Sequence, residues 1–159
     1  VLGGVAIAER HEARGAEDER VLGKVDKGCV FFITQAVYSV TASKNLLSDL
    51  HYRCAAAGRP VPPLLVTLSP CGSKKTLEFM AWLGVSVPRW LQNELLHAHD
   101  ILGKSIELCV QTFSELHEFA REKNIRLGCN VESVSLNKAE IEASVELVSR
   151  IQKIQHGPE

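Results

Sequence analysis

The sequence has no excess of charge of either sign and no long apolar run. Lysine and arginine together number 18, against 19 aspartates and glutamates. This balance excludes the basic surface through which proteins bind nucleic-acid phosphates, and it excludes an acidic tail. No stretch reaches the roughly 18 consecutive apolar residues of a membrane-spanning helix. With 45% hydrophobic and 23% charged residues, the composition predicts an ordinary globular protein without nucleic-acid or membrane partners.

Closely spaced cysteines are also missing. Cys54 and Cys71 are the closest of the five, and 17 positions separate them. Zinc sites and disulfide frameworks normally show short paired spacings such as C-x2-C. The sequence therefore predicts reduced thiols, no metal site and a cytoplasmic protein.

Two further absences bear on function and on length. Neither a G-x-G-x-x-G nor a P-loop motif follows any predicted strand, so the sequence lacks a nucleotide fingerprint. Position 1 is valine rather than methionine, and the first apolar run, 1–7, is too short for a signal peptide and has no charged leader. We therefore expect either a fragment of a longer protein or a processed chain.

The sequence contains four successive strand–helix units. Such alternation predicts an α/β fold with a parallel sheet and right-handed crossovers. Four such units form either a small open sheet or half of an eight-stranded TIM-type (βα)8 barrel, as a single partial domain over 1–159. The predicted strands are 3–8, 29–34, 63–68 and 126–134, with an extra helix after the third strand.

Two of the predicted helices are amphipathic, so the sequence predicts which side of each helix faces the core. Residues 9–27 are densely charged and predict one solvated helix with a narrow apolar stripe. Residues 138–154 predict a final helix with an inward face, which we expect to be made by Ile141, Val145, Val148 and Ile151.

Ligands of parallel α/β proteins bind at the carboxyl ends of the strands, so candidate residues lie just after each predicted strand. Gln35 ends an apolar strand, and its amide offers a donor beside an acceptor, which suits a pterin or flavin edge or loop backbone. His11 is a ligand contact, a base or part of a charge cluster. Glu132 is a candidate buried carboxylate. Residues 69–75 form either a phosphate cradle or an ordinary turn that Ser73 caps.

At these strand ends the sequence resembles the methylenetetrahydrofolate reductase family. The similarity follows the family's order and spacing over nearly the whole chain, and Ile-Thr-Gln, ending at Gln35, is its most specific part. The resemblance covers strands five to eight of the family's barrel. The matching segments are Gly3–His11, Lys24–Gly28, Phe32–Gln35, Val87–Trp90 and Ser135–Glu140.

The resemblance implies an oxidoreductase of one-carbon metabolism and methionine biosynthesis. Such a flavoprotein passes a hydride from NAD(P)H through FAD to 5,10-methylenetetrahydrofolate. Carried over by position, the implied FAD contacts are His11, Glu17, Arg20 and Lys24. The implied folate contacts are Gln35 at the pterin, Phe79 at the aryl group and Lys138 near the glutamate carboxylates.

The sequence departs from the family mainly because it contains only half of the family's barrel. A barrel takes about 250 residues, and the family's catalytic glutamate lies in the half that this chain does not contain. We therefore expect no catalytic residue here and low activity of the chain by itself. The alternative is a non-catalytic folate- or flavin-binding half-barrel. In either case its exposed sheet edges predict a homo-oligomer or association with a missing N-terminal half.

Overall fold

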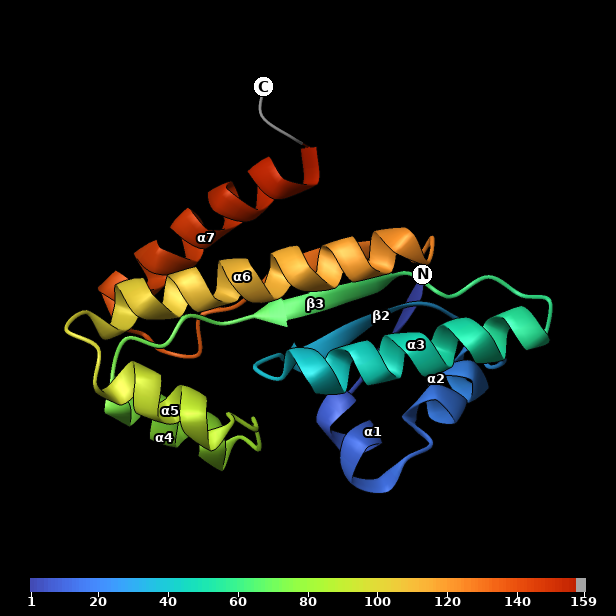
Figure 1. Ribbon diagram of the computed structural model, residues 1–159, viewed down its shortest axis with the longest axis horizontal. Helices are drawn as coiled ribbons and strands as arrows, with labels where there is room; N and C mark the ends of the chain where they lie inside the picture. Colours follow the sequence, from blue (N-terminus) through green and yellow to red (C-terminus); the bar gives the residue numbers. More distant parts are fainter. Residues whose placement is uncertain (157–159) are drawn as a thin grey trace.

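Strands and helices alternate along the chain in the computed structural model, which describes residues 1–156 (Figure 1). The predicted α/β alternation is confirmed, and two extra helices, rather than the one predicted, follow the third strand. The strands are β1 (Leu2–Ala6), β2 (Cys29–Ala36), β3 (Leu64–Leu68) and β4 (Leu127–Val131). The helices are α1 (Ala8–Arg14), α2 (Glu17–Val25), α3 (Val40–Ala56), α4 (Lys74–Trp82), α5 (Arg89–Leu96), α6 (Ile101–Glu122) and α7 (Lys138–His156).

The four strands form one parallel sheet in the order β1-β2-β3-β4. The order follows the sequence, so each crossover places its strand beside the previous one. Helices α3 and α6 run side by side along the sheet in Figure 1, and α2, α3, α6 and α7 all contribute to one hydrophobic core with it. Its largest fully buried side chains include Phe32 and Phe113.

The other face of the sheet carries no packed helix among the described residues. Side chains alternate across a strand, so Phe31 and Ile33 point away from the face that carries Phe32. The alternation ends there, because the pairing of β2 with β3 is irregular between Ile33 and Ala36. Phe31, Ile33 and Leu65 belong to neither hydrophobic cluster of residues 1–156. This helix-free face is apolar toward the amino ends of the strands and polar toward their carboxyl ends.

The single helix predicted over 9–27 is wrong, because the structure divides it into α1 and α2. The chain turns at Gly15 and Ala16, whose φ angles are 66° and 61°. This left-handed region interrupts the helical hydrogen bonds. The Glu17 carboxylate then accepts the Ile7 N–H at 3.1 Å and so holds α2 against the start of α1. A sequence pattern of charges contains no signal for such a contact.

The predicted inward face of the last helix is wrong at three of its four residues, and Ile151 is buried as predicted. α7 buries Glu140, Ala143, Leu147 and Ile151. Ile141, Val145 and Val148 are instead 44%, 66% and 40% exposed. Both sets recur at helical spacing, so periodicity alone could not choose between them. An apolar stripe of α7 (Ile141, Val145 and Val148) is thus left without a partner within residues 1–156.

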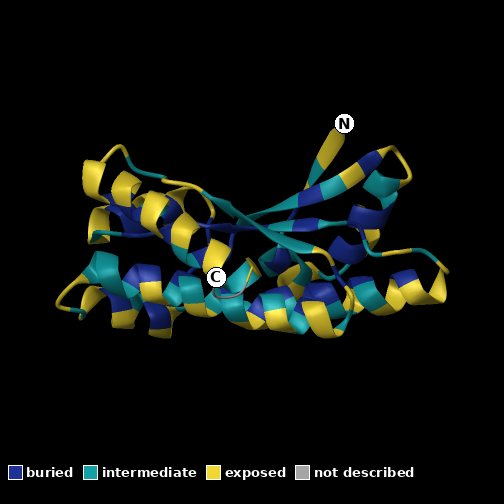
Figure 2. Cartoon of the chain, turned by 90° about the horizontal axis from the view of Figure 1, so that it is seen from above, coloured by how far each residue is buried: buried dark blue, intermediate teal, exposed yellow. Residues whose placement is uncertain are grey.

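The first strand is more exposed than its apolar sequence predicts. Leu2 and Val5 are 54% and 52% exposed, and only Ala6 is buried. β1 pairs with β2 on one side only, as an edge strand, and its exposed start carries the N-terminus in Figure 2. Lys24 donates to the Val5 carbonyl at 2.6 Å, which occupies one of the backbone groups that such strands leave free.

Helices α4 and α5 form a separate unit with a small core of its own. This hairpin lies at the end of the sheet toward which the β3 arrow points in Figure 1. Its core joins Met80 and Leu95 to Ala36 and Tyr38 from the end of β2. The hairpin therefore stands beside the carboxyl ends of β2 and β3, where the sequence places candidate ligand contacts.

Close packing between β1 and β2 gives a first prediction. A methyl group on Gly4 would lie 2.5 Å from the ring of Phe32, which is fully buried and cannot move aside. We expect Gly4→Ala to lower the free energy of unfolding by about 1–2 kcal/mol in urea titrations. Gly23→Ala is the control, because nothing lies within 4 Å of a methyl group there, and it should stabilise α2 by about 0.5–1 kcal/mol. Equal stability of the Gly4→Ala protein and the wild type would contradict this packing.

Candidate functional site

Gln35 lies at the carboxyl end of β2, beside the turn between α4 and α5. Its side chain is partly exposed, and its amide makes no hydrogen bond with any residue that the structure describes. A methyl group on Gly84, in the turn between α4 and α5, would lie 3.9 Å from the Gln35 Nε2 atom. The hairpin thus covers one side of this amide, while both its donor and its acceptor stay free for a ligand.

A row of polar side chains continues from Gln35 across the neighbouring strands. The Asn130 amide donates to Thr67 Oγ1 at 3.1 Å and to Glu132 Oε1 at 2.8 Å. Thr67 in turn donates to the Thr34 carbonyl at 2.6 Å. The sequence analysis missed Thr67 and Asn130. The sequence could have indicated them, because each is a polar residue two positions after Leu65 or Gly128 and so lies on the same face of its strand.

The two other predicted folate contacts lie on elements that follow the next strands. Phe79 is on α4 after β3, is 44% exposed and stacks on Trp82 with 5.7 Å between ring centroids. Lys138 begins α7 after β4, and its side chain is 88% exposed with a long 3.5 Å ion pair to Glu142. Gln35 therefore lies at the carboxyl end of β2, and Phe79 and Lys138 lie on the helices that follow β3 and β4. No hydrogen bond joins these three residues within residues 1–156.

Residues 69–75 form a turn that Ser73 caps, which is one of the two alternatives that the sequence left open. Ser73 Oγ accepts the Thr76 N–H at 3.1 Å, which confirms the predicted helix cap. The neighbouring Gly72 N–H donates to Glu140 Oε1 at 2.6 Å, and Thr76 Oγ1 donates to the same oxygen at 2.8 Å. A carboxylate of this chain thus occupies the helix N-terminus that a phosphate would need.

The buried carboxylate of this region is Glu140 rather than Glu132. Glu132 is exposed, which makes the prediction of a buried acid there wrong. Glu140 is only 3% exposed, and its Oε2 atom has no hydrogen-bond partner in the described chain. Gly72 permits this approach, because a methyl group there would lie 2.7 Å from Glu140 Oε1.

The predicted flavin residues gather at the junction of α1, α2 and α3. Glu17 is fully buried and accepts Arg10 at 2.7 Å and Arg20 at 3.3 Å. The His11 side chain is 9% exposed, and its Nε2 lies 2.8 Å from Asp49. Glu17 has no free surface for a cofactor, whereas His11 borders the hollow beside α3 but is already paired with Asp49. Arg20 is exposed, and Lys24 is committed to the Val5 carbonyl, so the four do not form a cradle for FAD.

The cysteine thiols show no sign of a reactive nucleophile. All five cysteines are free, as predicted. Burial raises the pKa of Cys109 and of Cys129 to about 12, so both remain protonated and weakly nucleophilic at neutral pH. Residues 1–156 contain no group of histidines, cysteines or carboxylates that could hold a metal ion. Within the same range, each helix is too short or too polar to cross a membrane.

The α1–α2–α3 junction predicts a loss of stability in acid. Burial by itself raises the pKa of Glu17 and of Asp18, but hydrogen bonds from Arg10 and Arg53 outweigh it and lower both pKa values. Carboxyls with a lowered folded-state pKa stabilise the fold above their unfolded pKa and lose this effect as the pH falls. We expect the urea midpoint to drop below about pH 4, and Asp18→Asn to reduce that drop. Asp26→Asn, in an exposed ion pair, should leave it unchanged; an identical pH profile for all three proteins would contradict the prediction.

No protein-family model and no curated protein matches this chain. A solved structure does. It is an uncharacterized protein from Clostridium thermocellum described as binding two copies of 5-methyl-5,6,7,8-tetrahydrofolic acid, and it is 53% identical with a TM-score of 0.91.

The match covers 97% of this chain but 54% of the Clostridium protein. The chain therefore spans about half the length of this solved relative. The relative is a folate-binding protein that shares the whole described fold. Its ligand belongs to the class of small molecule that the sequence predicted.

Proposed function

We propose that this chain binds a reduced folate of the 5-methyltetrahydrofolate type at the carboxyl ends of its strands. The observation that carries the proposal is the 53% identity, over nearly the whole chain, to a protein that binds this compound. The unpaired Gln35 amide at the carboxyl end of β2 supports it from the geometry. This reading corresponds to the non-catalytic alternative of the sequence analysis.

Each of the three predicted folate residues suits one part of a folate molecule. The Gln35 amide would donate to and accept from the pterin edge. Phe79 presents an exposed ring for the aryl group. Lys138 offers a cation for the glutamate carboxylates. The row of Thr67, Asn130 and Glu132 would line the pterin side of the same face.

Flavin-dependent reduction of methylenetetrahydrofolate stays a prediction of the family resemblance. His11 and Glu17 are engaged in the α1–α2–α3 junction, so the side chains predicted for FAD do not fit it as they stand. We therefore assign no step to FAD or NAD(P)H in this chain.

We also propose that the chain is half of an eight-stranded barrel, completed by the remaining half of a longer protein. Sequential parallel strands suit such a barrel. The helix-free face of the sheet and the exposed apolar stripe of α7 are the surfaces that a second set of strands and helices would cover. The length of the Clostridium relative supports this occupant. A second copy of the chain is the competing occupant, and light scattering would detect it as a dimer.

Calorimetric titration with 5-methyltetrahydrofolate tests the folate proposal. We expect saturable binding heat for the chain, and little heat for p-aminobenzoylglutamate, which lacks the pterin that Gln35 would recognise. If the folded chain gives no saturable heat with 5-methyltetrahydrofolate, the proposed function is wrong. A flavin spectrum that persists in the purified protein would instead favour the reductase prediction.

A further inference from the structure

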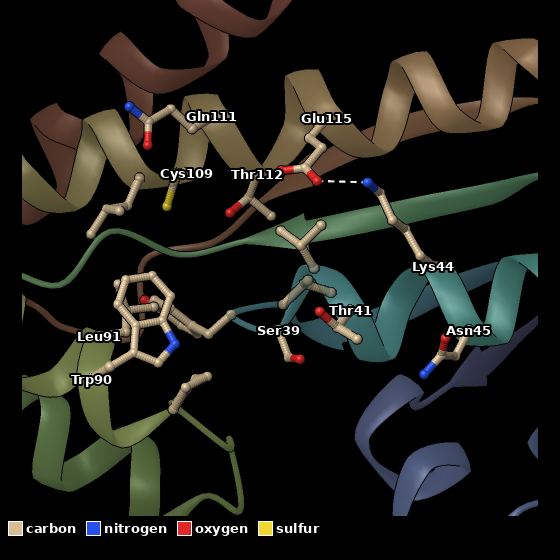
Figure 3. Close-up of a pocket in the computed structure, with 15 residues that line it drawn as sticks. Ser39, Thr41, Lys44, Asn45, Trp90, Leu91, Cys109, Gln111, Thr112 and Glu115 are labelled. Atoms are coloured by element: carbon tan, nitrogen blue, oxygen red, sulfur yellow. Dashed lines mark hydrogen bonds and ion pairs between the residues drawn. The ribbon is translucent and has the colours of Figure 1, made fainter.

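A concavity lies on the helical side of the sheet, between the start of α3, helix α5 and the middle of α6 (Figure 3). Its volume is about 450 Å³, within the usual range for small-molecule sites. Buried Val37 and Tyr38, which follow β2, form part of its wall. Gln35 does not line it, so this α3–α5–α6 cleft is separate from the Gln35 site.

Trp90 supplies a flat apolar wall of the cleft. It lies on the second residue of α5, and 62% of it is exposed although it lines a cavity. Figure 3 shows its indole ring directed into the space between α5 and α3. An indole left open in a concave site favours a planar heterocycle that stacks on it.

An ion pair crosses the opposite side of the cleft. Lys44 Nζ on α3 lies 2.6 Å from Glu115 Oε1 on α6, as the dashed line in Figure 3 marks. Glu115 Oε2 accepts no hydrogen bond from the described residues. Because Glu115 neutralises Lys44, the cleft does not favour an anion. The carboxylate instead suits a ligand edge with two adjacent N–H donors.

Further polar groups face the cleft without partners of their own. The side chains of Thr41, Asn45, Gln111 and Thr112 line it and make no hydrogen bond inside residues 1–156. They offer both donors and acceptors from two helices. A ring that carries a carbonyl beside its N–H groups would find complements for both.

We propose that the α3–α5–α6 cleft is a second site for a reduced folate. The pterin ring stacks on Trp90, and its 2-amino group and ring N–H donate to the Glu115 carboxylate. This inference rests on the folate binding proposed above and places a second ligand on the helical side of the sheet. The 2-amino-4-oxopyrimidine edge that the cleft recognises is shared with guanine, so the test includes guanosine.

Titration calorimetry with 5-methyltetrahydrofolate, on the wild type and matched variants, tests the second site. We expect the wild type to bind two ligands per chain. Glu115→Gln should weaken one of them by about tenfold or more, since the amide replaces one acceptor with a donor. The other ligand should bind as before. Glu118→Gln is the control, because Glu118 is exposed on the same helix and does not line the cleft.

Two further variants separate the ring contact from a charge contact. Trp90→Ala should weaken the same ligand as Glu115→Gln does. Lys44→Met should leave that ligand bound or tighten it, because it frees Glu115 Oε1. Loss of the ligand in Lys44→Met together with no effect of Glu115→Gln would overturn the proposal. Guanosine that binds the cleft while 5-methyltetrahydrofolate does not would overturn the folate assignment.

The stoichiometry distinguishes this inference from the function on which it rests. One ligand per chain, unaffected by Glu115→Gln and Trp90→Ala, would refute the second site and leave the proposed function standing. Two ligands that both depend on Gln35 alone would also refute it. No ligand at all would refute the folate function itself.

Discussion

Glu140→Ala is expected to destabilise the protein by about 2–4 kcal/mol, because two buried or half-buried donors lose their acceptor. Those donors are the Gly72 N–H and the Thr76 hydroxyl, at 2.6 and 2.8 Å from Glu140 Oε1. The carboxylate joins the start of α7 to the start of α4, whose sequence separation exceeds 60 residues. Urea or thermal unfolding followed by circular dichroism measures the loss.

Two other substitutions make this prediction specific. Glu140→Gln keeps an acceptor for both donors and removes the partnerless Oε2 charge, so most of the stability should return. Glu142→Ala, on the exposed side of the same helix, should change the free energy of unfolding by at most about 0.5 kcal/mol. A Glu140→Gln protein as unstable as Glu140→Ala would show that the charge, rather than the accepted hydrogen bonds, holds the turn.

Gln35→Leu is expected to weaken 5-methyltetrahydrofolate binding at the strand ends by about tenfold to a hundredfold. The amide makes no hydrogen bond within residues 1–156, so its donor and acceptor are free to pair with the pterin. Loss of two such hydrogen bonds corresponds to that range of dissociation constants. Leucine has a similar size, and no described hydrogen bond is lost, so the fold should be unchanged.

Titration calorimetry of Gln35→Leu beside Gln152→Leu tests this assignment. Gln152 is exposed near the end of α7, and its substitution should leave the affinity as in the wild type. If the two variants bind equally well, Gln35 does not contact the ligand. A loss of folding in Gln35→Leu would show in the circular dichroism spectrum before any titration.

Local sequence signals predicted the elements well where a single segment carries the information. Apolar strands such as 29–34 and the Ser73 cap of α4 were found, since propensity and capping act within a few residues. The split of 9–27 into α1 and α2 was not found. It depends on a left-handed turn at Ala16 and on the contact between Glu17 and the Ile7 N–H.

The candidate site was predicted in part for the same reason. The rule that ligands bind at strand carboxyl ends selected Gln35, and the fold places Gln35 there with a free amide. It could not select Thr67 or Asn130, because their hydrogen bond links neighbouring strands. It also chose Glu132 as the buried acid, whereas burial depends on which segments pack against a residue. The turn after β3 and the start of α4 pack against Glu140.

The sequence by itself determined the order of the strands, the parallel sheet and the absence of a nucleotide motif. These follow from periodicity and from the short reach of turns and caps. Only the tertiary structure decided which apolar stripe of α7 faces the sheet and which carboxylate closes the turn after β3. It also brought α3, α5 and α6 together around the cleft. Such features depend on contacts between distant segments, and the packing energy of those contacts selects among patterns that are locally equivalent.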